Sequence, residues 1–332
     1  MVPESYTCRM IHVSTHENIL EASTILQNGG IVAVPTETVY GLAGSINQPE
    51  AITEIFRRKG RPQDNPLIVH VSSFEEAYTL TTEEGREVIQ KIGIAFWPGP
   101  LTLVVPCSED VPSAVTAGLD TVAVRMPSNS IFLDLIRAAG SPLAAPSANV
   151  SGRPSPTRAE HVFEDLGKDV YILDGGACEH GIESTVIRIL DGTIHVLRPG
   201  AVSALDLEKL GFGAVVRSGQ PGESEVVRSP GTKYRHYAPA AEVILCKTID
   251  QANMFLQGDT RSSIVLVPEE YLGEFPSHAV RLLSAATVFD ELRRADSLQT
   301  RLIVVLCDES VMAHEALYNR LLKAAGKDGK GL

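Results

Sequence analysis

The chain has 332 residues, of which 44% are hydrophobic and 21% are charged, and its formal net charge at pH 7 is −12. This composition is that of an ordinary globular protein, and the length favours two domains over one. The negative charge disfavours a general nucleic-acid-coating protein, because such a surface repels phosphate backbones.

The five cysteines are far apart, odd in number and contain no C-x-x-C pair. They argue against a disulfide framework and against a zinc site, and they suit a reducing compartment. The first residues lack the pattern of a secretory signal, and no apolar run approaches the roughly 20 residues that cross a bilayer. We therefore expect a cytoplasmic protein that does not associate with membranes.

The first two thirds of the chain alternate short β-branched runs with helical patterns. The expected strands are 31–34, 67–71, 101–105, 121–125, 170–173, 185–189 and 194–197, and the expected helices are 17–27, 49–58, 83–95, 131–139 and 158–166. Asp191-Gly192 joins the last two strands and is typical of a β-hairpin. The pattern predicts an α/β domain over residues 1–212 with a mixed twisted sheet and helices.

Residues 213–240 are rich in glycine, proline, serine and charge and show no sustained periodicity. Such a segment is typical of a linker or a long functional loop. Residues 233–237 are five basic or aromatic side chains in succession, which a passive tether rarely carries. We interpret residues 213–240 as a linker that also serves as an active-site lid.

The alternation resumes over residues 241–332. Expected strands are 242–246, 263–267, 278–282 and 302–306, and expected helices are 250–257, 285–295 and 309–324. This pattern predicts a small Rossmann-like domain with three α/β layers. The P-loop, the G-x-G-x-x-G fingerprint, H-E-x-x-H and G-x-S-x-G are all missing, so a nucleotide would need a less common cradle.

The segment PTETVYGL, residues 35–42, follows the first expected strand. Polar residues at the carboxyl end of a strand are where α/β proteins place ligands. A helix is expected to follow, so a simple turn with an N-cap from Thr36 or Thr38 is the structural alternative.

Three further segments place polar groups where packing alone does not require them. Lys59 and Arg61 stand on a loop stiffened by prolines and could bind phosphate or carboxylate, although basic residues at a helix end are often simply solvated. Arg125 ends an apolar strand, which is unfavourable unless it meets an anion. Ser147 and Asn149 point to one side of an extended chain, although a polar surface loop would look similar.

Seven motifs occur in a fixed order: PTETVYGL, KGRPQDNPLIVHV, WPGPLTLV, VAVRMP, APSANVSGRPSPT, GIESTVI and VLRPG. Together they resemble the YrdC-like threonylcarbamoyl-AMP synthases, over roughly residues 15–202. The segment SPGTKYRHYAP and the small domain after it are similar to the long, two-domain form of that family. The resemblance implies that L-threonine, bicarbonate or CO₂, and ATP are condensed to threonylcarbamoyl-AMP and pyrophosphate.

The resemblance also assigns roles to single residues. The catalytic set would be Lys59, Arg61, Ser147 and Asn149. The threonine-binding set would be Thr36, Thr38, His70, Arg125, Ala145 and Thr185, with Arg125 at the carboxylate. The ATP-binding set would be Arg61, Asn65, Thr121, Ser147, Ser155, Arg198, Tyr234 and His236. By itself, a lone histidine in a strand such as His70 is more often structural.

Mg²⁺ is expected with ATP, held mainly by phosphate oxygens and water, because the motifs contain no carboxylate cluster that would act as protein ligands. The product would pass to a separate transferase that makes N6-threonylcarbamoyladenosine in tRNA, and we expect weak or no direct tRNA binding. Two other functions stay open: a carbamoyltransferase, and a non-catalytic RNA-binding module that uses the basic run 57–61. An open RNA groove would need no lid, and the extra cysteine pairs expected of multidomain carbamoyltransferases are absent.

Overall fold

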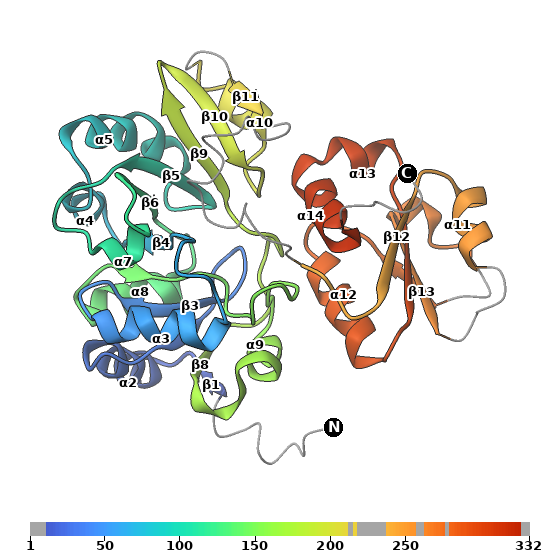
Figure 1. The fold of residues 1–332 in the computed structure, drawn as a ribbon, viewed down its shortest axis with the longest axis horizontal. Helices are drawn as coiled ribbons and strands as arrows, with labels where there is room; N and C mark the ends of the chain where they lie inside the picture. Colours follow the sequence, from blue (N-terminus) through green and yellow to red (C-terminus); the bar gives the residue numbers. More distant parts are fainter. Residues whose placement is uncertain (1–10, 212–214, 218–236, 257–261, 276–278, 327–332) are drawn as a thin grey trace. The chain divides into compact units, whose positions relative to one another are not determined.

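The structure is a computed structural model and describes residues 11–211, 215–217, 237–256, 262–275 and 279–326. It divides into two compact units (Figure 1). The first contains residues up to Ser151 and from Pro156 to Lys233, and the second contains Gly152–Ser155 and the chain from Tyr234 onward. Among the described residues, no helix is both long and apolar enough to cross a membrane.

The first unit is built on an eleven-stranded mixed sheet in the order β1-β8-β2-β3-β7-β4-β6-β5-β9-β10-β11. The strands are β1 (Ile11–Val13), β2 (Val32–Val34), β3 (Gly41–Ser45), β4 (Ile68–His70), β5 (Leu101–Pro106), β6 (Thr121–Arg125), β7 (Leu143–Ala144), β8 (Tyr171–Asp174), β9 (Thr185–Leu190), β10 (Thr193–Arg198) and β11 (Val215–Arg217). The sheet contains both parallel pairs, such as β4–β6, and antiparallel pairs, such as β5–β6. The predicted mixed sheet is confirmed.

Helices cover this sheet. The α-helices are α2 (His16–Gln27), α3 (Pro49–Lys59), α4 (Phe74–Thr79), α5 (Glu83–Val88), α6 (Ile94–Phe96), α7 (Ser113–Thr116), α8 (Ser130–Ala139), α9 (Ala159–Leu166) and α10 (Ala204–Glu208). Of these, α2, α3, α8 and α9 follow the predicted patterns closely, whereas the short helices α4, α7 and α10 were not predicted. The predicted helix 83–95 is interrupted by a π-helical turn over Ile89–Gly93, and a 3₁₀ turn spans Gly167–Asp169.

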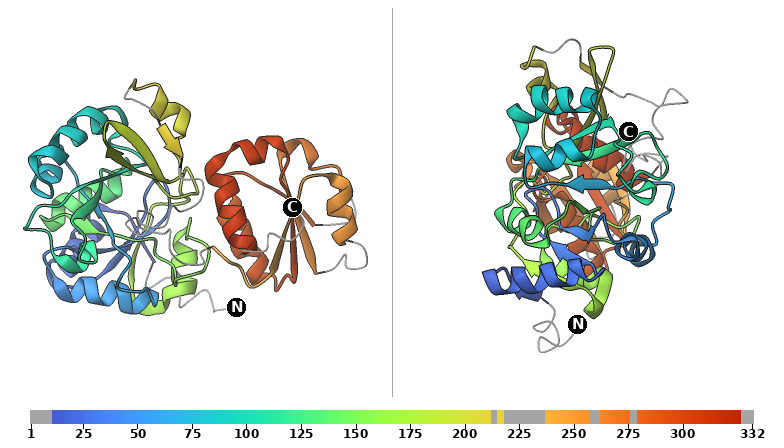
Figure 2. Two further views of the ribbon diagram at one scale, coloured as in Figure 1. Left: turned by 45° about the horizontal axis from the view of Figure 1, so that its top comes forward. Right: turned by 90° about the vertical axis from the view of Figure 1, so that its left-hand side faces the viewer.

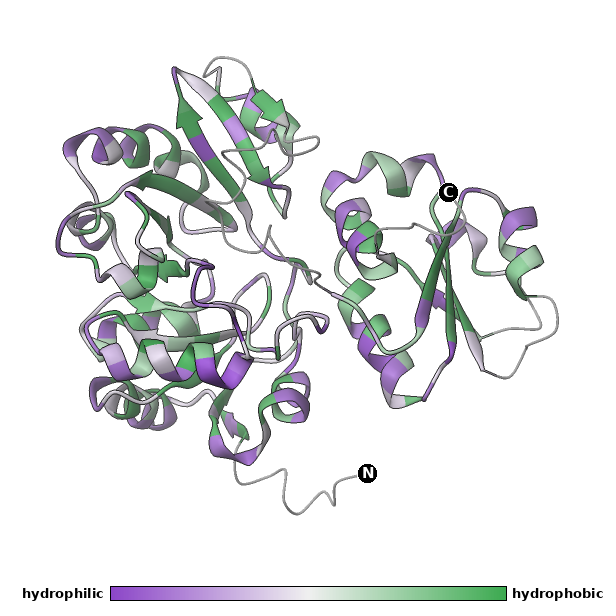
Figure 3. Ribbon diagram, viewed as in Figure 1, coloured by the Kyte–Doolittle hydropathy of each residue, from purple (hydrophilic) through white to green (hydrophobic). Residues whose placement is uncertain are grey.

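Alternate residues of β2 contribute to two separate hydrophobic cores. Ala33 belongs to the core covered by α3 and α9, whereas Val32 and Val34 belong to the core covered by α2 and α8. This follows from the two-residue period of a strand, because successive side chains point to opposite faces of the sheet. Figure 3 shows the result as strands that are mostly hydrophobic and helices that alternate in character.

The structural alternative of a helix capped by Thr36 or Thr38 is wrong, because Gly41–Ser45 forms strand β3, which was not among the expected strands and which pairs with β2 and β7. The small residues of β3 allow α3 to pack closely against it. A Cβ atom added to Gly44 would lie 3.0 Å from Ala51 Cβ and 3.1 Å from Ile55 Cδ1. The glycines of β3 weaken the usual sequence signal of a strand, but the close packing of α3 against β3 requires them.

The predicted hairpin is confirmed. Strands β9 and β10 pair antiparallel, with Ile189 opposite Ile194. Asp191 and Gly192 both have positive φ angles, of 49° and 74°. Two successive residues in that region form the turn whose twist matches the flanking strands.

The second unit has a four-stranded parallel sheet in the order β12-β15-β13-β14, with helices on both faces (Figure 2). Its elements are β12 (Glu242–Cys246), α11 (Ile249–Leu256), β13 (Ser263–Val267), a 3₁₀ turn (Glu269–Tyr271), β14 (Ala279–Leu282), α12 (Val288–Ser297), β15 (Leu302–Leu306), α13 (Glu309–Ala313) and α14 (Glu315–Ala325). The expected three-layer arrangement is confirmed. The single helix expected over 309–324 is two helices that meet at His314, whose Nδ1 accepts from Leu317 N.

The second unit also includes a short stretch from earlier in the chain, Gly152–Ser155. The fully buried Arg293 of α12 donates to the carbonyl of Pro154, and Ala238 N donates to the carbonyl of Gly152 at 2.9 Å. The predicted lid includes residues 213, 214 and 218–236, which lie outside the described residues, so its closure stays a prediction.

Replacing Gly44 with valine should lower the free energy of unfolding of the first unit by about 1–3 kcal/mol, because the added side chain meets Ala51 and Ile55 in a packed layer. Denaturant titration would measure the change. Glu50→Gln, at an exposed position of α3, is the control and should stay within about 0.5 kcal/mol of the parent protein. Equal stability of Gly44→Val and the parent would contradict the packing argument.

Candidate functional site

Arg125 is the last residue of β6, and its guanidinium is buried at the end of an apolar strand. Three protein groups surround it. Nε donates to the carbonyl of Gly99 at 3.2 Å, Nη1 donates to Thr38 Oγ1 at 3.0 Å, and Nη2 lies 2.6 Å from Glu37 Oε1. The guanidinium stays protonated at any physiological pH, and these contacts hold it rigidly inside the first unit. A fixed, buried cation of this kind is suited to binding an anion.

Two of these contacts come from the loop between β2 and β3, whose conformation is set by Thr36. Thr36 Oγ1 accepts from the backbone N–H groups of Thr38 and Val39, donates to the carbonyl of Val39, and lies 2.7 Å from Thr38 Oγ1. This local turn is the one that threonine and serine hydroxyls commonly build. It brings the predicted residues Thr36 and Thr38 together beside Arg125.

Glu37 belongs to this site, although we did not predict it from the sequence. Its side chain is 5% exposed and pairs with Arg125. Burial raises the pKa of this carboxyl, but the Arg125 guanidinium and the backbone N–H groups of Glu37 and Ser128 outweigh burial and leave the pKa below its ordinary value. Glu37 is therefore ionised. A carboxylate between two threonines in an apolar setting was the available sequence signal.

His70 is the last residue of β4, and it lies beside Arg125 because β4 and β6 pair in parallel with these two residues in register. Burial, and then the charge of Arg125, lower the pKa of His70 well below 6.5. The imidazole is consequently neutral at pH 7. Its Nδ1 has no hydrogen-bond partner among the described residues, and its ring packs 5.0 Å from that of Phe132.

Ala145, another predicted threonine contact, lies close to His70. It follows β7, which pairs antiparallel with β4, and its N–H donates to the carbonyl of Ile68 at 3.0 Å. Thr38, His70 and Arg125 therefore come from three separate segments and lie together at the carboxyl ends of β4 and β6, whereas Ala145 stands opposite Ile68 at the start of β4.

Lys59 organises the predicted catalytic set. It is the last residue of α3, is buried, and donates from Nζ to the carbonyls of Ser147 and Asn149 at 2.5 and 2.6 Å. The backbone N–H of Ser151 returns a bond to the carbonyl of Lys59. The end of α3 and the loop 147–151 thus form one rigid unit that carries three of the four predicted catalytic side chains.

Arg61 completes this set just beyond the left-handed cap at Gly60. Its Nε donates to the carbonyl of Asn65 and its Nη2 to that of Pro66, at 3.2 and 2.9 Å. The predicted ATP residues Arg61 and Asn65 are therefore neighbours. Asn65 is buried and Arg61 half-buried, so the loop presents a cation that its own carbonyls already orient.

Thr185 and Arg198 lie at the adjacent ends of β9 and β10. Thr185 N donates to the carbonyl of Pro100, next to the Gly99 carbonyl that holds Arg125. The hydroxyl of Thr185 donates to the carbonyl of Val202 at 2.6 Å, while Arg198 donates to the carbonyl of Ser184. Thr185 and Arg125 therefore bond to the carbonyls of two adjacent residues, Pro100 and Gly99.

The remaining predicted residues do not all lie near Arg125. Thr121 is the first residue of β6, so it lies about 13 Å from Arg125 along the strand. Ser155 is buried and belongs to the second unit. Tyr234 and His236 lie outside the described residues. Whether these four contact ATP stays a prediction.

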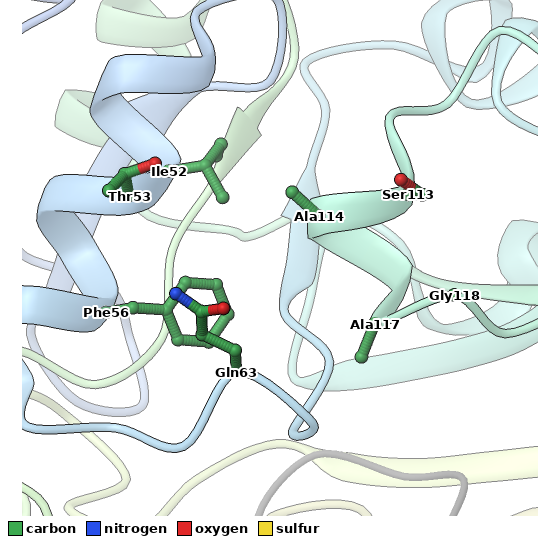
Figure 4. Close-up of a pocket in the computed structure, with 8 residues that line it drawn as sticks. All are labelled: Ile52, Thr53, Phe56, Gln63, Ser113, Ala114, Ala117 and Gly118. Atoms are coloured by element: carbon green, nitrogen blue, oxygen red, sulfur yellow. The ribbon is translucent and has the colours of Figure 1, made fainter.

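A separate pocket of about 320 Å³ lies between α3 and α7 (Figure 4). Its lining residues are Ile52, Thr53, Phe56, Gln63, Ser113, Ala114, Ala117 and Gly118. None of the predicted site residues lines it. Among the described residues there is also no group of three or more His, Cys, Asp or Glu side chains that could hold a metal ion.

Comparison with known proteins identifies the family. A family model described as "Telomere recombination" matches residues 24–200, and one described as "Threonylcarbamoyl-AMP synthase, C-terminal domain" matches residues 202–326. The threonylcarbamoyl-AMP synthase of Bacillus subtilis (strain 168) is 40% identical over 333 residues, covering 95% of each chain. The chain belongs to the threonylcarbamoyl-AMP synthases.

Other members of this family agree with that assignment. The threonylcarbamoyl-AMP synthase of Pyrococcus abyssi (strain GE5 / Orsay) is 49% identical over 226 residues, which is 68% of this chain and 66% of the relative. A crystal structure of P. abyssi Sua5 complexed with L-threonine superposes with a TM-score of 0.84 at 38% identity and covers 96% of both chains. The resemblance read from the motifs, including the two-domain form, is confirmed. The chain is an enzyme of the nucleotidyltransferase type.

The buried, neutral state of His70 has a measurable consequence for stability. Because its pKa is lower in the folded than in the unfolded chain, the unfolded state binds more protons below about pH 6.5, and stability falls as the pH decreases. The stability advantage of the parent over His70→Gln should shrink from about pH 7.5 to about pH 5.5, by at most about 1.4 kcal/mol per pH unit. Denaturant titrations at several pH values would test this, and parallel profiles for the two proteins would contradict a neutral buried imidazole.

Proposed function

We propose that this threonylcarbamoyl-AMP synthase condenses L-threonine, bicarbonate or CO₂, and ATP, and that Arg125 anchors the threonine carboxylate. The observation that carries the proposal is the state of Arg125. A guanidinium has five N–H donors, and Arg125 uses one in the hydrogen bond to Gly99 and one in the hydrogen bond to Thr38. Nη2 lies 2.6 Å from Glu37 Oε1 but makes no hydrogen bond among the described residues, so both terminal nitrogens keep N–H groups for a bidentate carboxylate. The relative from P. abyssi, solved with L-threonine, supports threonine as the substrate.

The chemistry has two steps. The unprotonated amine of threonine attacks the carbon of CO₂, and the proton lost from nitrogen leaves a carbamate anion. A carbamate oxygen then attacks the α-phosphorus of ATP, a new P–O bond forms, the bond to the β-phosphate oxygen breaks, and pyrophosphate leaves. Neither step demands a covalent enzyme intermediate, so positioning and charge stabilisation supply most of the catalysis.

The residues around Lys59 fit the second step. Lys59 and Arg61 bring two cations to one loop that their own contacts with backbone carbonyls hold rigid. Fixed cations lower the energy of the negative charge that builds on the α-phosphate without having to reorganise during the reaction. Ser147 and Asn149 lie on the separate loop whose carbonyls accept from Lys59, and their side chains would orient the phosphate and the carbamate.

Mg²⁺ would enter with ATP, held by phosphate oxygens and water, and would help to neutralise the triphosphate. The product is a mixed anhydride that water hydrolyses readily, so it should be consumed by a transferase that moves the threonylcarbamoyl group to adenosine in tRNA. The net charge of −12 favours a protein that does not itself bind tRNA tightly.

Release of pyrophosphate should require threonine and bicarbonate together. The purified protein would be incubated with ATP, Mg²⁺ and bicarbonate, with threonine or with each other amino acid, and pyrophosphate would be followed over time. The expected result is release with threonine that falls to background when either threonine or bicarbonate is omitted. Release independent of both would contradict the proposal, and salt-sensitive RNA binding without ATP consumption would favour an RNA-binding module instead.

Lys59→Met should lower kcat by about 10²–10³-fold, because the variant loses a fixed cation at the developing charge. It should also lower the free energy of unfolding by about 1–3 kcal/mol, since two carbonyls lose their donor. The matched control is Lys91→Met at an exposed position, where both quantities should stay near those of the parent. A Lys59→Met enzyme that keeps kcat within tenfold would place the charge stabilisation elsewhere.

A further inference from the structure

We propose that Glu37 is a positioning residue for amino-acid binding, because it fixes the orientation in which Arg125 meets the substrate carboxylate. This inference rests on the proposed threonine site and adds to it a residue that makes no assigned contact with either substrate. Glu37 acts through Arg125, whose own contacts define the geometry.

The contact with Glu37 is the shortest of the three that hold the guanidinium. Arg125 Nη2 lies 2.6 Å from Glu37 Oε1, compared with 3.0 Å from Nη1 to Thr38 and 3.2 Å from Nε to Gly99. Thr38 and Gly99 offer neutral oxygens, whereas Glu37 offers a charge. Nη2 and Oε1 form an ion pair without a hydrogen bond, and attraction between opposite charges is strong in a buried setting. Glu37 therefore dominates the placement of the Nη2 end, which must present an N–H group to the substrate.

The loop is shaped so that Glu37 can reach Arg125 together with its neighbour. Consecutive side chains in an extended segment point in opposite directions, so Glu37 and Thr38 would not normally converge on one group. The turn built by Thr36 changes the chain direction between them. The backbone of Glu37 is held separately, since its carbonyl accepts from His180 N at 2.8 Å. The backbone that carries the Glu37 carboxylate is thus held in place.

Electrostatics suggest two effects of Glu37, and they oppose each other. Both partners of the pair are at most 5% exposed, so an unpaired Arg125 would be a costly buried charge. The carboxylate also competes with the substrate carboxylate for the same cation. If competition dominated, removing the charge of Glu37 would tighten threonine binding; if orientation dominates, it would weaken binding. We infer that orientation dominates, because the substrate needs two aligned N–H groups rather than only a positive field.

The test compares Glu37→Gln and Glu37→Asp with the parent enzyme, by measuring KM for threonine, KM for ATP, and threonine affinity by calorimetry. Glu37→Gln should raise KM for threonine at least tenfold and leave KM for ATP within twofold. Glu37→Asp keeps the charge and should recover part of the loss. Glu291→Gln is the matched control, since Glu291 is a buried carboxylate 3.9 Å from Arg281 in the second unit, and should change neither constant by more than twofold.

A double-mutant cycle shows whether Glu37 acts through Arg125. Lysine has no fork to orient, so in an Arg125→Lys background the Glu37→Gln change should alter threonine affinity less than threefold. Unchanged or tighter threonine binding in Glu37→Gln alone would overturn the inference, and so would an equal rise in both KM values. A parent protein that does not bind threonine would overturn the proposed function as well, whereas normal binding by both the parent and Glu37→Gln removes only the role of Glu37.

Discussion

The buried guanidinium of Arg125 is the constraint on which the proposed threonine site depends. A permanent charge at the end of an apolar strand is tolerated only when several oxygens surround it, and here they come from two segments that are far from Arg125 and from each other in the sequence. The β2–β3 loop supplies Thr38 and Glu37, and the segment before β5 supplies Gly99. Satisfying one charge therefore fixes these two segments relative to the end of β6, which is the preorganisation that a binding site requires.

A second organising charge, Lys59, has the same effect on the predicted catalytic side. It donates to the carbonyls of Ser147 and Asn149, so the end of α3 cannot move without the loop that carries these residues. The two charges differ in the partners described for them. Arg125 pairs with the carboxylate of Glu37, whereas Lys59 donates to the carbonyls of Ser147 and Asn149.

The fold was largely predictable because most of its strands are bounded by strong local signals. The strand Thr121–Arg125 and the hairpin turn at Asp191-Gly192 follow from β-branched residues and from a dipeptide that accepts positive φ. Strand β3 was not predicted, because its glycines and alanine are chosen for contact with α3 rather than for strand propensity. The break at His314 was missed for a similar reason, since a helical apolar pattern continues across it.

The sequence by itself determined the residue types of the site, the order of its motifs and the family to which they belong. Lys59, Arg61, Arg125, Ser147 and Asn149 could all be chosen from the chain alone, because charges and polar groups beside apolar strands need a reason to be there. Only the tertiary structure decided which of them meet. The partnership of Glu37 with Arg125 and that of Lys59 with two distant carbonyls depend on strand pairing across about 90 residues, which no local pattern records.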